Sequence, residues 1–170
     1  MTLFDKAQTI GGQLNLAKMV PGKEEFWGLV DWFSEMLKSS GAEVKLGEIV
    51  TSSDVIDFDE VIIATGVSPR DPKIKGHEKN NVVSYVEVLN GTGQIGQKVA
   101  VIGAGGIGFD VSEYLVHENK SDNKQIEIPK WMKEWGVGDP NKTPGGLAEI
   151  GPKPEAAVRQ VTLMQRKKQK

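Results

Sequence analysis

The chain has 170 residues, 38% of them hydrophobic, and its 21 basic and 23 acidic side chains leave a formal net charge of −2, too small to draw it to nucleic acid or anionic lipid. It contains no cysteine, which excludes disulfides, thiol nucleophiles and thiolate-held iron–sulfur clusters within the chain. No apolar run approaches the roughly 20 residues of a membrane span and no secretion signal is evident, so we expect a cytoplasmic protein without membrane or nucleic-acid partners.

Short strands and one long helix are expected at the start of the chain. Residues 2–5 predict a strand that ends in an acid, and residues 43–46 and 49–51 predict two more short strands. Between them, residues 24–39 place apolar side chains at i, i+3/i+4 and i+7. This spacing predicts an amphipathic helix, which Gly41 is placed to stop.

Two continuous apolar runs predict strands in separate small sheets. Residues 61–64 and 99–102 each end at a glycine turn, and we expect both runs to form parallel strands covered on both faces. Residues 68–76 hold prolines among charges, which predicts an extended connection between two lobes. We place the main boundary near Gly96.

The second lobe has the order of a βαβ unit. A helical pattern follows the strand at 99–102, and a further strand is predicted at 159–164. The long polar stretch 118–158 predicts an insertion with little regular structure, pinned by Trp131 and Trp135. The helix and the two strands are therefore the parts expected to build a site.

The sequence GAGGIG at residues 103–108 fits the motif G-x-G-x-x-G between a strand and a helix. In this motif Gly103 permits the tight turn, Gly105 lets backbone N–H groups approach a pyrophosphate, and Gly108 lets helix and strand pack closely. The helix N-terminus adds partial positive charge. The pattern predicts a dinucleotide site, and the alternative is a glycine-rich structural turn.

The strand at 159–164 is followed by Gln165, Arg166, Lys167 and Lys168, where an NAD site normally places an acid. Cations at this point favour NADPH, because Arg166 suits planar contact with a 2′-phosphate and Lys167 acts as a point charge. The alternative is a solvated basic terminus.

Asp5 has the opposite character, because an acid at a strand end is placed like the ribose ligand of an FAD-type Rossmann half. Residues 10–13 and 64–66 would bring backbone close to a flavin nucleotide, although either stretch would equally serve as a plain turn.

Taken in order, these motifs resemble the C-terminal part of bacterial NADPH-dependent 2,4-dienoyl-CoA reductases, within the old yellow enzyme-like flavoproteins. In that family an N-terminal β/α barrel carries FMN, a 4Fe-4S cluster and catalytic acids, and a C-terminal region like the disulfide reductases binds FAD and NADPH. The resemblance rests on residues 3–5, 11–13, 21–26, 64–66, 101–110, 135–136 and 163–167.

The resemblance assigns cofactor roles to individual residues of the first lobe. It implies that Asp5 binds the FAD ribose and that Val50 meets the adenine through its backbone. It also implies that Gln13 and Lys23 lie along the flavin nucleotide.

In the second lobe the resemblance implies that Gly103, Gly105 and Gly108 face the NADPH pyrophosphate. Arg166 and Lys167 would then lie at the 2′-phosphate. No catalytic residue or metal ligand is expected in the chain itself.

We therefore expect an α/β protein with an incomplete Rossmann-like, disulfide-reductase-type FAD lobe at residues 1–67 and a connection at 68–96. The opening βαβ unit of an NADPH lobe follows at 97–170. As a fragment without the barrel, the chain would accept hydride from NADPH onto FAD for 2,4-dienoyl-CoA reduction in fatty acid β-oxidation, and would be inactive alone.

Two other functions are compatible with the sequence. One is a non-catalytic nucleotide-binding or assembly module, and the other is a simple NAD(P)-dependent dehydrogenase, which lacks an arranged proton donor. Open sheet edges also favour self-association.

Overall fold

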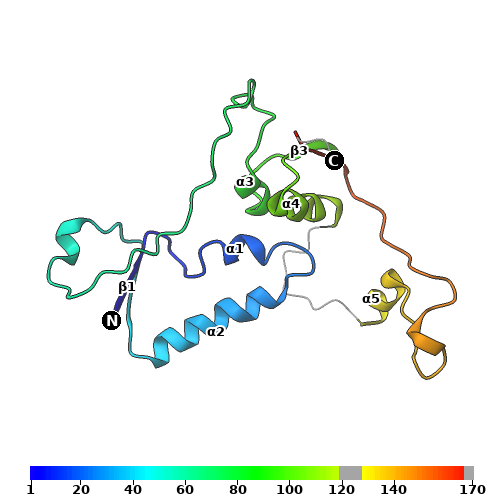
Figure 1. Ribbon diagram of the computed structural model, residues 1–170, viewed down its shortest axis with the longest axis horizontal. Coiled ribbons are helices and arrows are strands. Elements are labelled where there is room, and N and C mark those ends of the chain that lie inside the picture. Colours follow the sequence, from blue (N-terminus) through cyan, green and yellow to red (C-terminus); the bar gives the residue numbers. More distant parts are fainter. Residues whose placement is uncertain (119–127, 167–170) are drawn as a thin grey trace. The chain divides into compact units, whose positions relative to one another are not determined.

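The computed structural model describes residues 1–118 and 128–166, and the chain divides into two compact units, Met1–Gly93 and Gln94–Lys170 (Figure 1). Each unit holds one two-stranded parallel sheet together with helices, so the predicted α/β class is confirmed. No helix within the described residues is both long and apolar enough to cross a membrane. The assignment of FAD and NADPH lobes to parts of these units stays a prediction.

The sheet of the first unit pairs β1 (Thr2–Asp5) with β2 (Glu43–Leu46), and both strands were predicted from the sequence. The two strands are parallel, with Thr2 opposite Glu43 and Asp5 opposite Leu46. Their carboxyl ends therefore lie at one edge of the sheet. The Glu48 N–H donates to the Asp5 carbonyl at 3.1 Å, which continues the pairing beyond the strands.

The crossover between these strands carries α1 (Leu14–Ala17) and α2 (Glu25–Ser39), which pack on each other. The predicted amphipathic helix is α2, and Gly41 follows it with a φ of +71°. Trp27 fixes the packing, because its indole Nε1 donates to the Lys18 carbonyl at 3.1 Å. The Lys18 ammonium lies 4.0 Å from the centre of the same indole ring.

Two strands predicted for the first unit are wrong. The apolar run 61–64 has no regular secondary structure, and Ile62 and Ile63 are 90% and 83% exposed. Residues 49–51 are irregular and lead into the short 3₁₀ helix η1 (Ser52–Val55). A strand needs a neighbour to complete its ladder of hydrogen bonds. The described residues of this sheet offer only β1 and β2, so the apolar run has no partner.

The connection predicted at 68–76 contains no helix or strand, and it leads to α3 (Tyr85–Leu89). A capping box begins α3, in which the Glu87 carboxylate accepts the Ser84 N–H at 2.7 Å and the Ser84 hydroxyl accepts the Glu87 N–H at 3.3 Å. The backbone and hydroxyl hydrogen bonds from Ser84 hold the pKa of the Glu87 carboxyl below its usual range.

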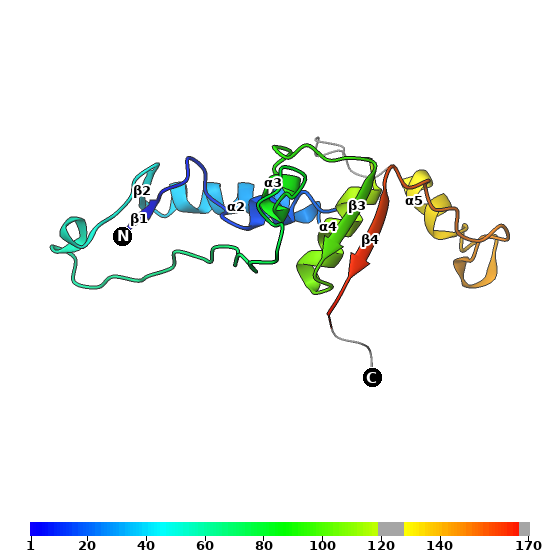
Figure 2. The same ribbon diagram turned by 90° about the horizontal axis from the view of Figure 1, so that it is seen from above.

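The second unit is built on β3 (Lys98–Ile102) and β4 (Gln160–Met164), which pair in parallel, and on α4 (Gly106–Val116). Figure 2 shows α4 lying along one face of this sheet. Both predicted strands form, but the expectation that 99–102 is covered on both faces is wrong. Exposed and half-buried residues alternate along β3, and Ile102 is 68% exposed. The described residues place no second layer on the other face.

The segment predicted to lack regular structure contains α5 (Ile128–Trp135), which carries both tryptophans of this region. The ring centres of Trp131 and Trp135 are 6.3 Å apart. Beyond α5, an antiparallel bridge joins Val137 to Leu147. The two tryptophans lie one turn apart on this helix and are 41% and 64% exposed, so the expectation that they pin the segment stays a prediction. The helix itself was not predicted.

Candidate nucleotide-binding site

A glycine loop joins the carboxyl end of β3 to the first turn of α4. Gly103 has a φ of +120°, a conformation that favours glycine, and its N–H donates to the Met164 carbonyl at 2.9 Å. Gly105 is the residue before α4, and no side chain caps the helix at this end. The first N–H groups of a helix have no partners within the helix and bind anions well. The loop therefore offers backbone donors and a helix dipole at the sheet edge.

Gly108 fixes how closely α4 approaches β3. A Cβ atom at Gly108 would lie 1.7 Å from the Gly103 carbonyl oxygen and 3.5 Å from Leu163 Cδ1. By contrast, a Cβ atom at Gly105 or Gly106 would meet no protein atom within 4 Å. Thus one glycine permits tight packing while the others leave open space in front of the loop. This geometry fits a pyrophosphate, and the roles of Gly103, Gly105 and Gly108 as ligands stay predictions.

Arg166 is brought to the same edge of the sheet as the glycine loop. It follows β4 by two residues, and the parallel register places Met164 opposite Ile102. The side chain of Arg166 is exposed and so is available to an anion. Lys167, the other predicted phosphate ligand, lies outside the described residues.

At the other end of α4, Arg159 supports the helix in a way that the sequence did not predict. Its Nη1 donates to the Leu115 carbonyl at 3.3 Å, and the Val158 N–H donates to the Val116 carbonyl at 2.9 Å. A cation is favourable at a helix C-terminus, where carbonyl groups carry partial negative charge. Burial raises the pKa of the neighbouring Tyr114 phenol, and the positive charge of Arg159 opposes that rise.

In the first unit, Asp5 is the last residue of β1 and lies at the carboxyl edge of the sheet, and Val50 follows the end of β2 by four residues. This is the edge at which parallel α/β sheets bind ligands. The Asp5 side chain is already oriented, because its Oδ1 accepts the Ala7 N–H at 2.8 Å. A carboxylate held in this way suits a ribose hydroxyl, although both roles stay predictions.

Gln13 and Lys23 lie on the crossover between β1 and β2. The Gln13 side-chain amide donates to the Val67 carbonyl at 3.3 Å, which brings the loop after β1 to the turn at Gly66. Lys23 lies just before α2, and its N–H donates to the Val20 carbonyl at 3.1 Å. Gln13 of the stretch 10–13 thus contacts Val67, the residue after the stretch 64–66. The roles of Gln13 and Lys23 at a flavin nucleotide stay predictions.

Comparison with known proteins identifies a family model and several relatives that the chain matches. The family model described as pyridine nucleotide-disulphide oxidoreductase matches residues 7–166. A NADH oxidase of Thermoanaerobacter brockii is 35% identical over 122 residues, which are 68% of this chain and 19% of that protein. A cinnamate reductase of Clostridium sporogenes is 34% identical over 136 residues, which are 79% of this chain and 20% of that protein.

One solved structure is also similar to the chain. A 2-naphthoyl-CoA reductase in complex with 2-naphthoyl-CoA matches with a TM-score of 0.63 and 27% identity, and the match covers 68% of this chain and 18% of that one. The chain thus spans about a fifth of the length of the proteins that it matches.

Proposed function

Because the chain belongs to the pyridine nucleotide-disulphide oxidoreductase family, we propose that it forms the NADPH-accepting region of a flavin-dependent oxidoreductase. Membership of this family implies binding of FAD and of a pyridine nucleotide. The observation that carries the proposal is the approach of α4 to β3 at Gly108, which leaves open space in front of Gly105 and Gly106. A loop of this shape at a helix N-terminus suits a dinucleotide pyrophosphate.

The chain's own residues would bind and orient the nucleotides. The N–H groups of the glycine loop would hold the pyrophosphate, and Arg166 and Lys167 would hold the 2′-phosphate. Asp5 would accept hydrogen bonds from the FAD ribose. When bound, FAD supplies a two-electron acceptor for hydride from NADPH.

The preference for NADPH over NADH rests on the cations after β4. One relative is named a NADH oxidase, so likeness to relatives does not decide the nucleotide. In the sequence, the cations Arg166 and Lys167 follow this strand and favour a 2′-phosphate, and no acid stands at that position to repel it.

For the substrate, we propose the reduction of a conjugated thioester of the 2,4-dienoyl-CoA type. Two relatives are named for cinnamate and for 2-naphthoyl-CoA, both of which are conjugated carboxylic acids or thioesters. The chain has no cysteine and so provides no thiolate for a 4Fe-4S cluster. Substrate reduction would therefore need FMN and cluster-bearing parts that these residues do not supply.

The test is an anaerobic titration of the flavin-loaded protein with NADPH. We expect the visible absorption of oxidised flavin to bleach, and an equal amount of NADH to act far less. If flavin binds but neither nucleotide bleaches it, the alternative of a non-catalytic nucleotide-binding or assembly module is favoured. Open sheet edges support self-association for such a module.

A further inference from the structure

A tight loop at residues 71–78 lies in the predicted connection, and local hydrogen bonds shape it. Asp71 Oδ1 accepts the Lys73 N–H at 2.8 Å, and the His77 N–H donates to the Ile74 carbonyl at 2.9 Å. Lys73 has a φ of +50° and is the one non-glycine residue with positive φ in the part of the chain that the structure describes. Such a conformation is unfavourable for lysine, so the loop needs contacts that hold it.

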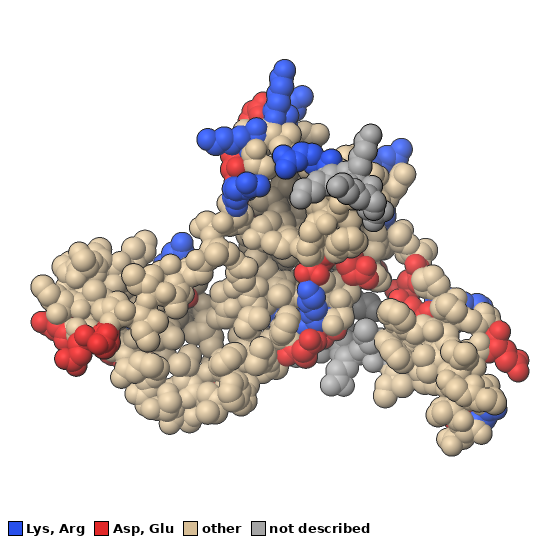
Figure 3. All heavy atoms as spheres, viewed as in Figure 1, with Lys and Arg blue, Asp and Glu red and all other residues tan. Residues whose placement is uncertain are grey.

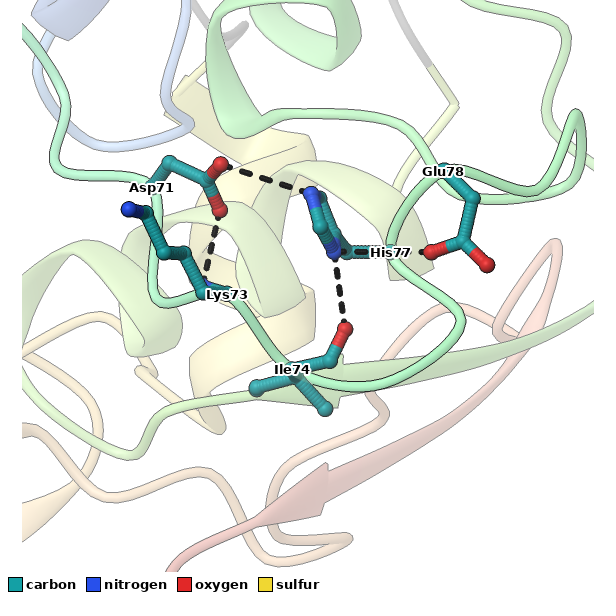
Figure 4. A network of polar contacts seen from close by, with 5 residues as sticks. All are labelled: Asp71, Lys73, Ile74, His77 and Glu78. Atoms are coloured by element: carbon teal, nitrogen blue, oxygen red, sulfur yellow. Dashed lines mark hydrogen bonds and ion pairs between the residues drawn. The ribbon is translucent and has the colours of Figure 1, made fainter.

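The His77 side chain provides these contacts through both ring nitrogens (Figure 4). Nδ1 lies 2.9 Å from the Ile74 carbonyl oxygen, and Nε2 lies 3.4 Å from Asp71 Oδ2. A carbonyl and a carboxylate are acceptors only. Nδ1 forms a hydrogen bond with the Ile74 carbonyl, whereas the approach of Nε2 to Asp71 is an ion pair that exists only when the imidazole is protonated.

A further carboxylate approaches the imidazole ring, and lysine side chains lie on the same loop. Glu78 Oε2 lies 3.5 Å from Nδ1 and adds a second negative charge beside the ring. The Lys73 ammonium points away from the ring in Figure 4, and the Lys79 stem lies against Gly76. Basic side chains gather over this segment at the top of Figure 3. Within the described residues, the charged groups that lie within ion-pair distance of the ring are thus the carboxylates of Asp71 and Glu78.

We propose that residues 71–78 form a proton-dependent clasp in which protonated His77 ties the Asp71 carboxylate to the Ile74 carbonyl. A neutral ring keeps only the hydrogen bond to Ile74 and loses the ion pair with Asp71. With its hydrogen on Nδ1, it retains the Ile74 contact but presents a lone pair to the Asp71 carboxylate. Loss of the proton therefore removes the contact that closes the loop around strained Lys73.

The sign of the pH effect follows from this geometry. Because the closed loop needs the bound proton, closure is favoured at lower pH and is lost as the pH rises.

The experiment uses ¹⁵N relaxation on the whole chain at about pH 5.5 and about pH 8, on either side of histidine titration. We expect the heteronuclear NOE at the amides of Lys73, Ile74 and His77 to be high at the lower pH and to fall clearly at the higher one. His77→Gln should abolish this difference, and Asp71→Asn should greatly reduce it. Unchanged amide shifts in α2, which lies in the same unit as the loop, would show that each variant is folded.

The other histidine gives a matched control. His117 Nδ1 lies 3.0 Å from the Glu113 carbonyl at the end of α4. His117→Gln should leave the response of the loop intact. A loop NOE that is the same at both pH values, or a pH response that persists in His77→Gln, would overturn the clasp.

Discussion

At Gly108 the nucleotide loop depends directly on the absence of a side chain. In Gly108→Ala the new methyl group would lie 1.7 Å from the Gly103 carbonyl oxygen, so that α4 must move away from β3. We expect a loss of about 1–3 kcal/mol in the free energy of unfolding, as for other overpacked sites, and a large loss of NADPH affinity. Thermal unfolding followed by circular dichroism and a fluorescence titration with NADPH measure the two effects.

Gly106→Ala is the matched control for that substitution. The added Cβ meets no protein atom within 4 Å, and alanine is favoured over glycine in a helix by about 0.5–1 kcal/mol. The variant should therefore unfold at the same temperature as the natural chain or higher. Equal destabilisation by the two alanines would rule out close packing as the reason for Gly108.

Replacing Arg166 and Lys167 together by alanine tests the choice of nucleotide. Each charge-assisted hydrogen bond contributes about 1.5–3 kcal/mol, so NADPH affinity should fall on the order of a hundredfold or more. NADH affinity should barely change. The natural preference should also weaken as ionic strength rises, because salt screens exposed charges. Titrations with both nucleotides at two salt concentrations measure these effects.

A cation at the far end of the sheet controls for overall charge. Lys98 begins β3, at the edge opposite the glycine loop, and is exposed. Lys98→Ala should leave the preference for NADPH unchanged. If the double variant loses NADH and NADPH affinity equally, the basic cluster is a solvated or structural feature.

Among single residues, those with a local motif could be predicted from the sequence. The glycines at 103, 105 and 108 follow a fixed spacing between a strand and a helix. Arg159 could not be found in this way, because its partner Leu115 is 44 positions away and only the packing of β4 beside α4 brings them together. The same holds for the amide of Gln13, whose acceptor Val67 is 54 positions away.

At the scale of elements, the capping box of α3 should make this short helix sensitive to acid. The pKa of Glu87 is lowered by its hydrogen bonds from Ser84, so the carboxylate stabilises α3 at neutral pH. That contribution is present above the usual glutamate range and is lost as the pH falls through the lowered value. Hydrogen-exchange protection of the Val88 and Asn90 amides, which bond back into the helix, should fall over this window.

Glu87→Gln is the control for the acid effect. Glutamine can still accept the Ser84 N–H but does not titrate. Its protection factors should show little change with pH in the same window. An equal fall in the variant and in the natural chain would mean that other groups unfold α3.

The long helix and the four strands that find a partner formed as predicted, whereas the two predicted strands without a neighbour did not. The helix Glu25–Ser39 has apolar residues at helical spacing, so its pattern alone suffices. The run 61–64 has the composition of a buried strand, but the described sheet gives it no neighbour. The helix Ile128–Trp135 was not predicted, because Pro129 and the glycines and prolines after the helix are typical of irregular structure. Proline is nevertheless tolerated in a first helical turn.

At the scale of the whole molecule, the cofactor content limits what the chain can do. It has no cysteine to ligate an iron–sulfur cluster, and it spans about a fifth of its relatives' length. We therefore expect 2,4-dienoyl-CoA to cause no catalytic consumption of NADPH by the purified chain beyond the stoichiometric reduction of any bound flavin. Loss of NADPH absorbance is the measurement. Clear turnover by pure protein would overturn the proposal that further parts are required.

The register of β3 with β4 also constrains how the second unit is made. Lys98 pairs with Gln160, so the partners are 62 positions apart in the chain. At about 5–20 residues per second, the ribosome needs about 3–12 s to deliver β4 after β3 has been synthesised. During that interval α4 can already cover one face of β3, but the edges of the strand have no partner. A nascent chain that stalls there would expose an apolar unpaired strand to other chains on the same polysome.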